Sequence, residues 1–287
     1  MVLKMKSFVL TLSCEDRPGI VAAITTELAD LGANIAESDQ FWDRVTNRFF
    51  MRIEFIVPVE TTRDAIANAI SPVVNRFDLK TELTDMSRRK KMIIMVSKFD
   101  HALLHLLYQI RVGWMDAEVV AIVSNHEDSA RTATHEGIPF HYWPVTKANK
   151  AEQEDKLLAL VKETGADLVV LARYMQILSD TLSKRLFGKV INIHHSFLPS
   201  FKGARPYHQA HERGVKMIGA TAHYVTADLD EGPIIEQDAE RVNHSLSAND
   251  FAARGRDIEA RVLARAVKFH LENRVIIVGN KTIVFNR

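Results

Sequence analysis

The sequence predicts an α/β protein of two domains: a small N-terminal βαββαβ domain and a larger domain with a doubly wound, mostly parallel sheet. Short runs of β-branched residues alternate with stretches of helical periodicity along the whole chain. The order of these elements changes at a polar, basic segment, MSRRKK at 86–91, which is typical of a linker. We therefore expect one domain over residues 1–85 and the other over residues 92–287.

The composition is typical of a globular protein that folds in water. The chain has 287 residues, of which 47% are hydrophobic and 25% charged, enough for a core in each domain. Its net charge of +1 gives no electrostatic reason to expect nucleic acid or a membrane surface as a partner. The single cysteine, Cys14, cannot form an intramolecular disulfide, and no apolar run is long enough to span a membrane. We therefore expect a cytoplasmic protein.

The first domain has the element order of a ferredoxin-like fold. The turn at Pro18-Gly19 precedes a helical pattern that Gly32 ends, and Pro72 falls inside the second helical pattern, where we expect a break. The expected strands cover 8–14, 34–41, 48–57 and 78–83, and the expected helices cover 20–31 and 62–77.

Two short motifs make this domain similar to a known regulatory family. DRPG-I-V follows the first strand and L-G-A-N-I follows the first helix, and together with the element order they resemble the ACT domain over about residues 6–85. The resemblance implies an amino-acid effector, such as glycine or methionine, at Pro18, Gly19, Gly32 and Asn34, where backbone N–H groups at a helix start can hold a carboxylate. The alternative is an oligomerisation module without a ligand, and in either case we expect a homo-oligomer.

The second domain alternates strands with helices, which predicts a Rossmann-like parallel sheet with its site at the carboxyl ends of the strands. The expected strands cover 92–96, 118–123, 140–143, 168–171, 190–193, 219–225 and 234–239, with a terminal hairpin of 275–278 and 282–285. The expected helices cover 101–112, 127–136, 151–163, 179–186, 206–213 and 247–272.

One stretch of this domain, VINIHHSFLPSFKG at 190–203, leads from a strand directly into polar residues. Asn192 and His194 share a face of the strand, whereas His195 is expected to point the other way. An amide and an imidazole at one strand end can polarise a carbonyl and move a proton. Taken one at a time, these residues could equally be hydrogen-bonding groups at the end of a strand.

A second polar stretch, GATAHYVTADLDEGPII at 219–235, carries Asp228, Asp230 and Glu231 on one loop. Such carboxylates can bind a metal, cap a turn or act as a base. His101 and His105 have the i, i+4 spacing of some metal ligands, but no third ligand is evident. We therefore expect no metal ion at this histidine pair.

Together, the N-x-H motif, LPSFKG and HYVTADLDEGPII resemble the formyltransferase catalytic domain of enzymes that use 10-formyltetrahydrofolate, over about residues 90–285. The resemblance implies a catalytic trio of Asn192, His194 and Asp230, and it implies no metal or redox cofactor. It also implies that ARYMQILS at 172–179 lines the folate pocket, where Met175, Ile177 and Leu178 would contact the ligand. Core packing is the alternative for these apolar side chains.

The first turn after a strand of this domain bears on the formyl acceptor. It reads SKFDH at 97–101, without the glycines that would hold a ribonucleotide phosphate, and we expect no basic addition for binding transfer RNA. The chain therefore resembles the branch of the family that hydrolyses 10-formyltetrahydrofolate to tetrahydrofolate and formate, which supplies formate for purine synthesis and balances one-carbon pools. Lys98 and His101 are candidates for excluding an amine and ordering the water. Transfer to a small amine and a non-catalytic folate- or amino-acid-binding regulator remain the alternatives.

Overall fold

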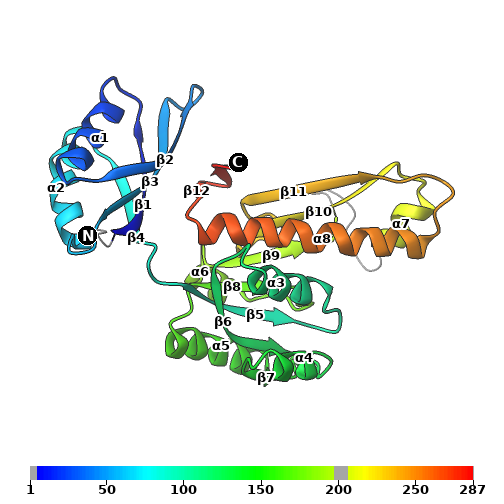
Figure 1. Ribbon diagram of the computed structural model, residues 1–287. Helices are drawn as coiled ribbons and strands as arrows, with labels where there is room; N and C mark the ends of the chain where they lie inside the picture. The colour runs from blue at the N-terminus through cyan, green and yellow to red at the C-terminus, as the bar shows by residue number, and fades with distance from the viewer. Residues whose placement is uncertain (1–4, 197–205, 287) are drawn as a thin grey trace. The chain divides into compact units, whose positions relative to one another are not determined.

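The computed structural model describes residues 5–196 and 206–286, and it divides into two compact units. The first unit contains residues 1–89 together with 272–276 and 283–287, and the second contains residues 90–271 and 277–282. The end of the chain therefore contributes residues to both units. Each unit has its own sheet, and Figure 1 shows the elements of both.

The first unit is the βαββαβ domain that the sequence predicts. It consists of β1 (Met5–Glu15), α1 (Ile20–Asp30), β2 (Asn34–Asp43), β3 (Arg48–Pro58), α2 (Arg63–Phe77) and β4 (Lys80–Asp85). The antiparallel sheet has the order β2-β3-β1-β4, and apolar side chains of α1 and α2 complete a core with those of the sheet. The ferredoxin-like prediction is confirmed.

Helix α2 corrects one detail of the sequence analysis, because it runs through Pro72 without a break. The side chain of Thr62 accepts a hydrogen bond from the backbone N–H of Ala65 and caps the start of the helix. Four side chains at helical spacing are buried on one face: Ile66, Ile70, Val73 and Phe77. Burial of this face outweighs the backbone hydrogen bond that the proline cannot donate.

A buried ion cluster ties the chain's end to the sheet of the first unit. Arg274 donates to Glu37 on β2 at 2.8 Å, and Arg52 on β3 donates to the same oxygen at 2.8 Å. Burial by itself would raise the pKa of Glu37, but the hydrogen bond from Arg274 and the charge of Arg52 lower it to about 2. Glu37 is therefore ionised at neutral pH, and its charge balances part of that of the two guanidinium groups.

The second unit is the predicted doubly wound domain. Its sheet contains β5 (Lys90–Val96), β6 (Ala117–Ser124), β7 (Phe140–Tyr142), β8 (Leu168–Leu171), β9 (Val190–His194), β10 (Met217–Tyr224) and β11 (Ile234–Arg241). Its helices are α3 (His101–Arg111), α4 (Ala130–His135), α5 (Lys150–Thr164), α6 (Asp180–Arg185), α7 (Pro206–Glu212) and α8 (Ala248–Leu271). The hairpin of β12 (Val275–Val278) and β13 (Lys281–Val284) follows at the end of the chain.

The strand order β11-β10-β9-β8-β5-β6-β7 explains where a site can form. Strands β5 to β9 are parallel, whereas β10 and β11 are antiparallel additions at one edge. The chain turns to opposite sides of β5, with β6 on one side and β8 on the other, and such a reversal opens a crevice at the carboxyl ends of the strands. The segments after β5 and β8 both begin at this crevice.

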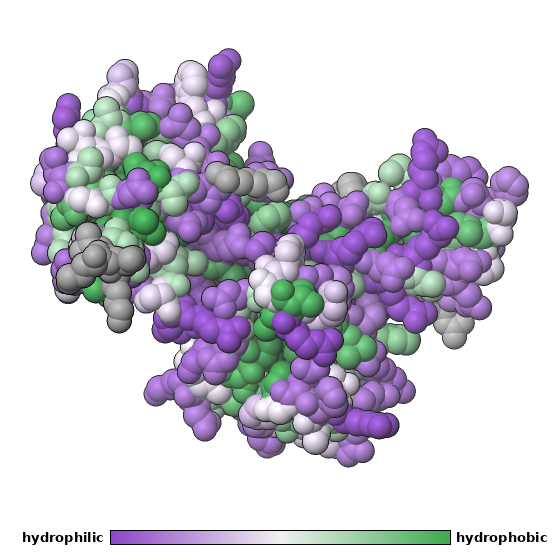
Figure 2. Space-filling model, in the orientation of Figure 1, coloured by the Kyte–Doolittle hydropathy of each residue, from purple (hydrophilic) through white to green (hydrophobic). Residues whose placement is uncertain are grey.

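Figure 2 shows that polar side chains dominate the visible surface of both units, with apolar side chains in smaller groups. The second unit has an apolar core under its helices, formed largely by β5, β6 and β8 with α5 and α6. Within residues 5–196 and 206–286, each helix is either too short or too polar to cross a membrane.

Candidate active site

The site is built on the face that β9 and β10 share. Asn192 and His194 are two positions apart on β9, so their side chains lie on one side of the sheet. In the antiparallel register, His223 of β10 lies opposite Asn192, and opposed residues share a face. All three side chains line a cavity of about 460 Å³. The prediction that Asn192 and His194 share a face is confirmed.

Asp230 reaches this face because the loop between β10 and β11 folds back. The carboxyl end of β10 lies beside the start of β9, where the backbone N–H of Val225 donates to the carbonyl oxygen of Val190 at 3.0 Å. The loop then returns, and Asp230 has the left-handed φ of 58°. Its Oδ1 lies 3.2 Å from Nδ1 of His194 and 3.8 Å from Nε2 of His223.

Gly232 makes this return possible. A Cβ atom at this position would lie 1.8 Å from the carbonyl oxygen of Tyr224, so only glycine lets the two backbones approach so closely. The backbone N–H of Tyr224 donates to the carbonyl oxygen of Pro233 at 2.9 Å and closes the loop. The Gly-Pro pair of the sequence motif thus fixes where Asp230 stands.

The Asp230–His194 pair sets the protonation of both groups. The hydrogen bond from His194 lowers the pKa of Asp230, against the effect of partial burial, and the neighbouring histidines lower it further. Asp230 is therefore an ionised hydrogen-bond acceptor, and Nδ1 of His194 is protonated and donates to it. Nε2 of His194 is buried and has no hydrogen-bond partner among the described residues. It is left available for a group in the cavity.

His223 is a site residue that the sequence analysis missed. Its Nδ1 lies 2.9 Å from the carbonyl oxygen of Tyr224 and must donate to it, so its Nε2 accepts from Nδ2 of Asn192 at 3.3 Å. Burial lowers the pKa of His223 and keeps this ring neutral. His223 thereby fixes which way the amide of Asn192 points. The signal was present in the HYV motif, at the position that pairs with Asn192.

His195 corrects a second prediction, because it does not point away from His194. Strand β9 ends at His194, so the alternation of faces stops there. The two rings stack with their centroids 4.9 Å apart and their planes 18° apart, and His195 also lines the cavity. Nδ1 of His195 lies 2.6 Å from a guanidinium nitrogen of Arg173, which follows β8.

The three apolar candidates for folate contacts all line the cavity. Met175 and Ile177 are 55% and 58% exposed, whereas Leu178 is buried. The segment is anchored to the turn after β5, because the backbone N–H of Met175 donates to Oγ of Ser97 at 3.0 Å. Because Met175 and Ile177 are large, apolar and exposed at the cavity, their placement suits contact with an aromatic ligand better than a role in core packing.

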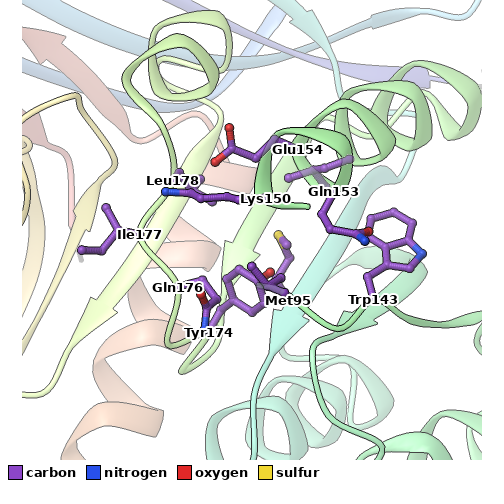
Figure 3. Close-up of a pocket in the computed structure, with 11 residues that line it drawn as sticks. Met95, Trp143, Lys150, Gln153, Glu154, Tyr174, Gln176, Ile177 and Leu178 are labelled. Carbon is purple, nitrogen blue, oxygen red and sulfur yellow. The ribbon is translucent and has the colours of Figure 1, made fainter. Parts of the chain in front are cut away.

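A second, much smaller cavity of about 20 Å³ borders the same segment, and Figure 3 shows the residues that line it. Four residues line both cavities and so separate them: Tyr174, Gln176, Ile177 and Leu178. Met95 and Trp143 also line the small cavity, whose volume suits a single water molecule and not a larger ligand.

The acceptor-side candidates lie elsewhere. Lys98 is exposed, and Nε2 of His101 lies 2.9 Å from Oε2 of Glu259 on α8; the residues that line the large cavity include neither of them. Part of the strand-end motif, Leu198, Pro199, Lys202 and Gly203, falls within 197–205 and lies outside the described residues. Across the described ranges, no group of three or more His, Cys, Asp or Glu side chains is placed to hold a metal ion.

The effector candidates of the first unit fall into two pairs. Pro18 and Gly19 precede α1, whereas Gly32 and Asn34 follow it, and all four are exposed. The 11 residues of α1 separate the pairs by about 16 Å. One small amino acid cannot touch both pairs within a single chain.

Comparisons with known proteins agree with this architecture. The formyl transferase family matches residues 90–267, and the ACT domain family matches residues 8–70. A formyltetrahydrofolate deformylase of Bacillus subtilis (strain 168) is 49% identical over 279 residues, which cover 96% of this chain and 93% of the relative. A formyltetrahydrofolate deformylase of Corynebacterium sp. (strain P-1) is 48% identical over 277 residues, which cover 96% and 97%.

Solved structures show the same likeness, over nearly the whole chain in one case and over its larger part in another. The crystal structure of formyltetrahydrofolate deformylase from Burkholderia mallei ATCC 23344 has a TM-score of 0.92 and 48% identity, covering 98% of this chain and 100% of that one. Glycinamide ribonucleotide transformylase 1 from Symbiobacterium toebii has a TM-score of 0.63 and 28% identity, covering 71% of this chain and 98% of that one.

Proposed function

The chain belongs to the formyltetrahydrofolate deformylase family, and we propose that its large cavity hydrolyses 10-formyltetrahydrofolate to tetrahydrofolate and formate. The observation that carries this proposal is the Asp230–His194 pair, which leaves Nε2 of His194 unpartnered in the cavity beside Asn192. A base, its orienting carboxylate and an amide donor are the groups that hydrolysis of a formamide requires.

The reaction begins with attack of water on the formyl carbon. Nε2 of His194 accepts a proton from the water as the new C–O bond forms, and Asp230 stabilises the imidazolium through Nδ1. The negative charge that develops on the formyl oxygen is held by the free N–H of Asn192, whose amide His223 orients. The C–N10 bond then breaks, N10 takes the proton from His194, and the product leaves as formic acid, which loses its remaining proton to water and becomes formate.

Three side chains of the large cavity, which we call the apolar wall, supply the substrate's binding energy. Met175, Ile177 and Leu178 would contact the pteridine, and the anchoring bond from Met175 to Ser97 keeps the wall in place. A glycine-free turn after β5 supports water as the acceptor over a phosphate-bearing amine. His101 pairs with Glu259 and Lys98 is exposed, and because neither lines the large cavity we assign neither of them a direct part in the hydrolysis.

The first unit would regulate this reaction by binding a small molecule. Its fold and its ACT match support an amino-acid effector such as glycine or methionine. Because Pro18 and Gly19 lie about 16 Å from Gly32 and Asn34, a site that uses both pairs needs two copies of the chain. The proposal therefore includes a cytoplasmic homo-oligomer that works in one-carbon metabolism and purine synthesis.

The test is formate release from 10-formyltetrahydrofolate in water enriched in oxygen-18, with no amine present. The proposal predicts one formate per tetrahydrofolate, carrying one oxygen from the labelled water. Turnover that begins only when a small amine is added would instead identify a formyltransferase. Tight binding of the substrate without turnover would identify a regulator.

A further inference from the structure

A buried charged cluster lies behind His195, and the proposed reaction does not use it. At its centre is Glu259 of α8, which is only 1% exposed. The hydroxyl of Tyr207 donates to its Oε1 at 2.7 Å, Nε2 of His101 lies 2.9 Å from its Oε2, and Nε of Arg173 lies 3.4 Å from the same oxygen. Burial alone would raise the pKa of Glu259, but these donors and the charge of Arg173 lower it. Glu259 is therefore an anion that holds Arg173 in place.

The geometry of Arg173 fixes the protonation of His195. A guanidinium group has only donors, and one of its nitrogens lies 2.6 Å from Nδ1 of His195. Nδ1 must accept this hydrogen bond, so it carries no proton, and the single ring proton is on Nε2. Arg173 has a φ of 65°, in the left-handed region, which aims its side chain from the end of β8 toward the ring.

The stacking of the two rings explains why the neutral state of His195 matters for the reaction. The rings of His194 and His195 lie nearly parallel with their centroids 4.9 Å apart. A charge on His195 would repel the proton that His194 takes from water, whereas a neutral ring supports His194 without this penalty. We propose that His195 is a positioning residue of the catalytic site: Glu259 holds Arg173, and Arg173 holds His195 as a neutral ring stacked on His194.

Every charged group around His195 bears on this state. Burial, then the charges of Arg173 and His194, lower the pKa of His195 to about 4, while Glu259 and Asp230 act in the opposite direction. The inference rests on the proposed hydrolysis for its purpose. The protonation state of the His195 ring can be measured without substrate. A failure of this inference can therefore be told from a failure of the proposed hydrolysis.

The direct test is nitrogen-15 NMR of the wild-type protein with labelled histidine. The signals of His195 are assigned because they are absent from the spectrum of His195→Gln. The expected signals are an unprotonated Nδ1 and a protonated Nε2 that stay unchanged from pH 8 down to pH 5.5. A protonated Nδ1 in this range, in either the other tautomer or the imidazolium, would overturn the proposal. The measurement requires no folded variant of the cluster.

The kinetic test compares pH profiles of kcat/KM for formate release. Arg173→Met removes the charge that helps to keep His195 neutral, so its loss of activity should be about twofold greater at pH 6 than at pH 8, because burial still opposes protonation of the ring. Arg173→Lys keeps a donor-only cation and should restore the wild-type shape. Adding His195→Gln to Arg173→Met should remove the extra acidic loss. The same loss at every pH in Arg173→Met, or an acidic loss that persists in the double variant, would show that the cluster is merely structural.

Discussion

Replacing Gly232 with alanine tests whether the fold-back of the Asp230 loop is what completes the site. The new Cβ would lie 1.8 Å from the carbonyl oxygen of Tyr224, while real Cβ contacts essentially never fall under 3.0 Å, so the backbone must move by at least 1.2 Å. Asp230 is two residues away, and its bond to His194 is 3.2 Å long. A displacement of about 1 Å in a catalytic group costs roughly 100-fold in rate.

We therefore expect Gly232→Ala to lower kcat/KM for formate release by about 100-fold. The matched control is Gly214→Ala, which introduces left-handed strain at a φ of 66° but no clash, since no atom lies within 4 Å of its Cβ. That control should lose about 1–2 kcal/mol of stability in urea unfolding and keep its activity. Wild-type kcat/KM in Gly232→Ala would show that the position of Asp230 does not depend on the close approach of the two backbones.

Three further predictions concern the amide donor, the apolar wall and the ion cluster. Asn192→Ala should lower kcat by about 100–1,000-fold with little change in KM, since the lost hydrogen bond forms fully only in the transition state; a change in KM alone would contradict this. Ile177→Ala should raise KM about tenfold at constant kcat through about 1.5 kcal/mol of lost apolar contact, while Phe187→Ala, also exposed but outside the cavity lining, should leave KM unchanged. Glu37 has a depressed pKa, so its stabilising effect is full above its ordinary value of 4.5 and is lost as the pH falls toward 2. Glu37→Gln should accordingly lose about 3 kcal/mol of unfolding free energy at pH 7 and much less at pH 3, measured in urea; an equal loss at both pH values would contradict the ionised cluster.

The fold followed from the sequence because hydrophobic periodicity and turn residues agreed along most of the chain. Strand β8 was predicted with its observed bounds, and most other elements differ only at their ends. Pro72 was misjudged because a local rule on proline gave way to burial of the apolar face of α2. Likewise, residues 272–276 carry no local signal that places them in the first unit, since that depends on Arg274 meeting Glu37.

The site was predictable only where a motif carried it. Asn192, His194 and Asp230 came from motifs, and the structure brings them to one cavity. His223 could be recognised only from strand pairing, because its partner Asn192 is 31 positions away. Glu259 looked like one more charged residue of a long helix, and its burial depends on donors from three other segments. Single-sequence patterns do not report such long-range partners.

The most direct test of the account is formate release by Asp230→Asn beside Glu231→Gln. The first change replaces the carboxylate that fixes and charges His194, and the second removes a neighbouring exposed charge that does not line the cavity. We expect Asp230→Asn to lose about 10⁴-fold in kcat with its fold intact by circular dichroism, as when an orienting carboxylate is replaced by its amide in other hydrolases, and Glu231→Gln to match the wild type. Equal activity of Asp230→Asn and the wild type would show that the Asp230–His194 pair does not drive the hydrolysis.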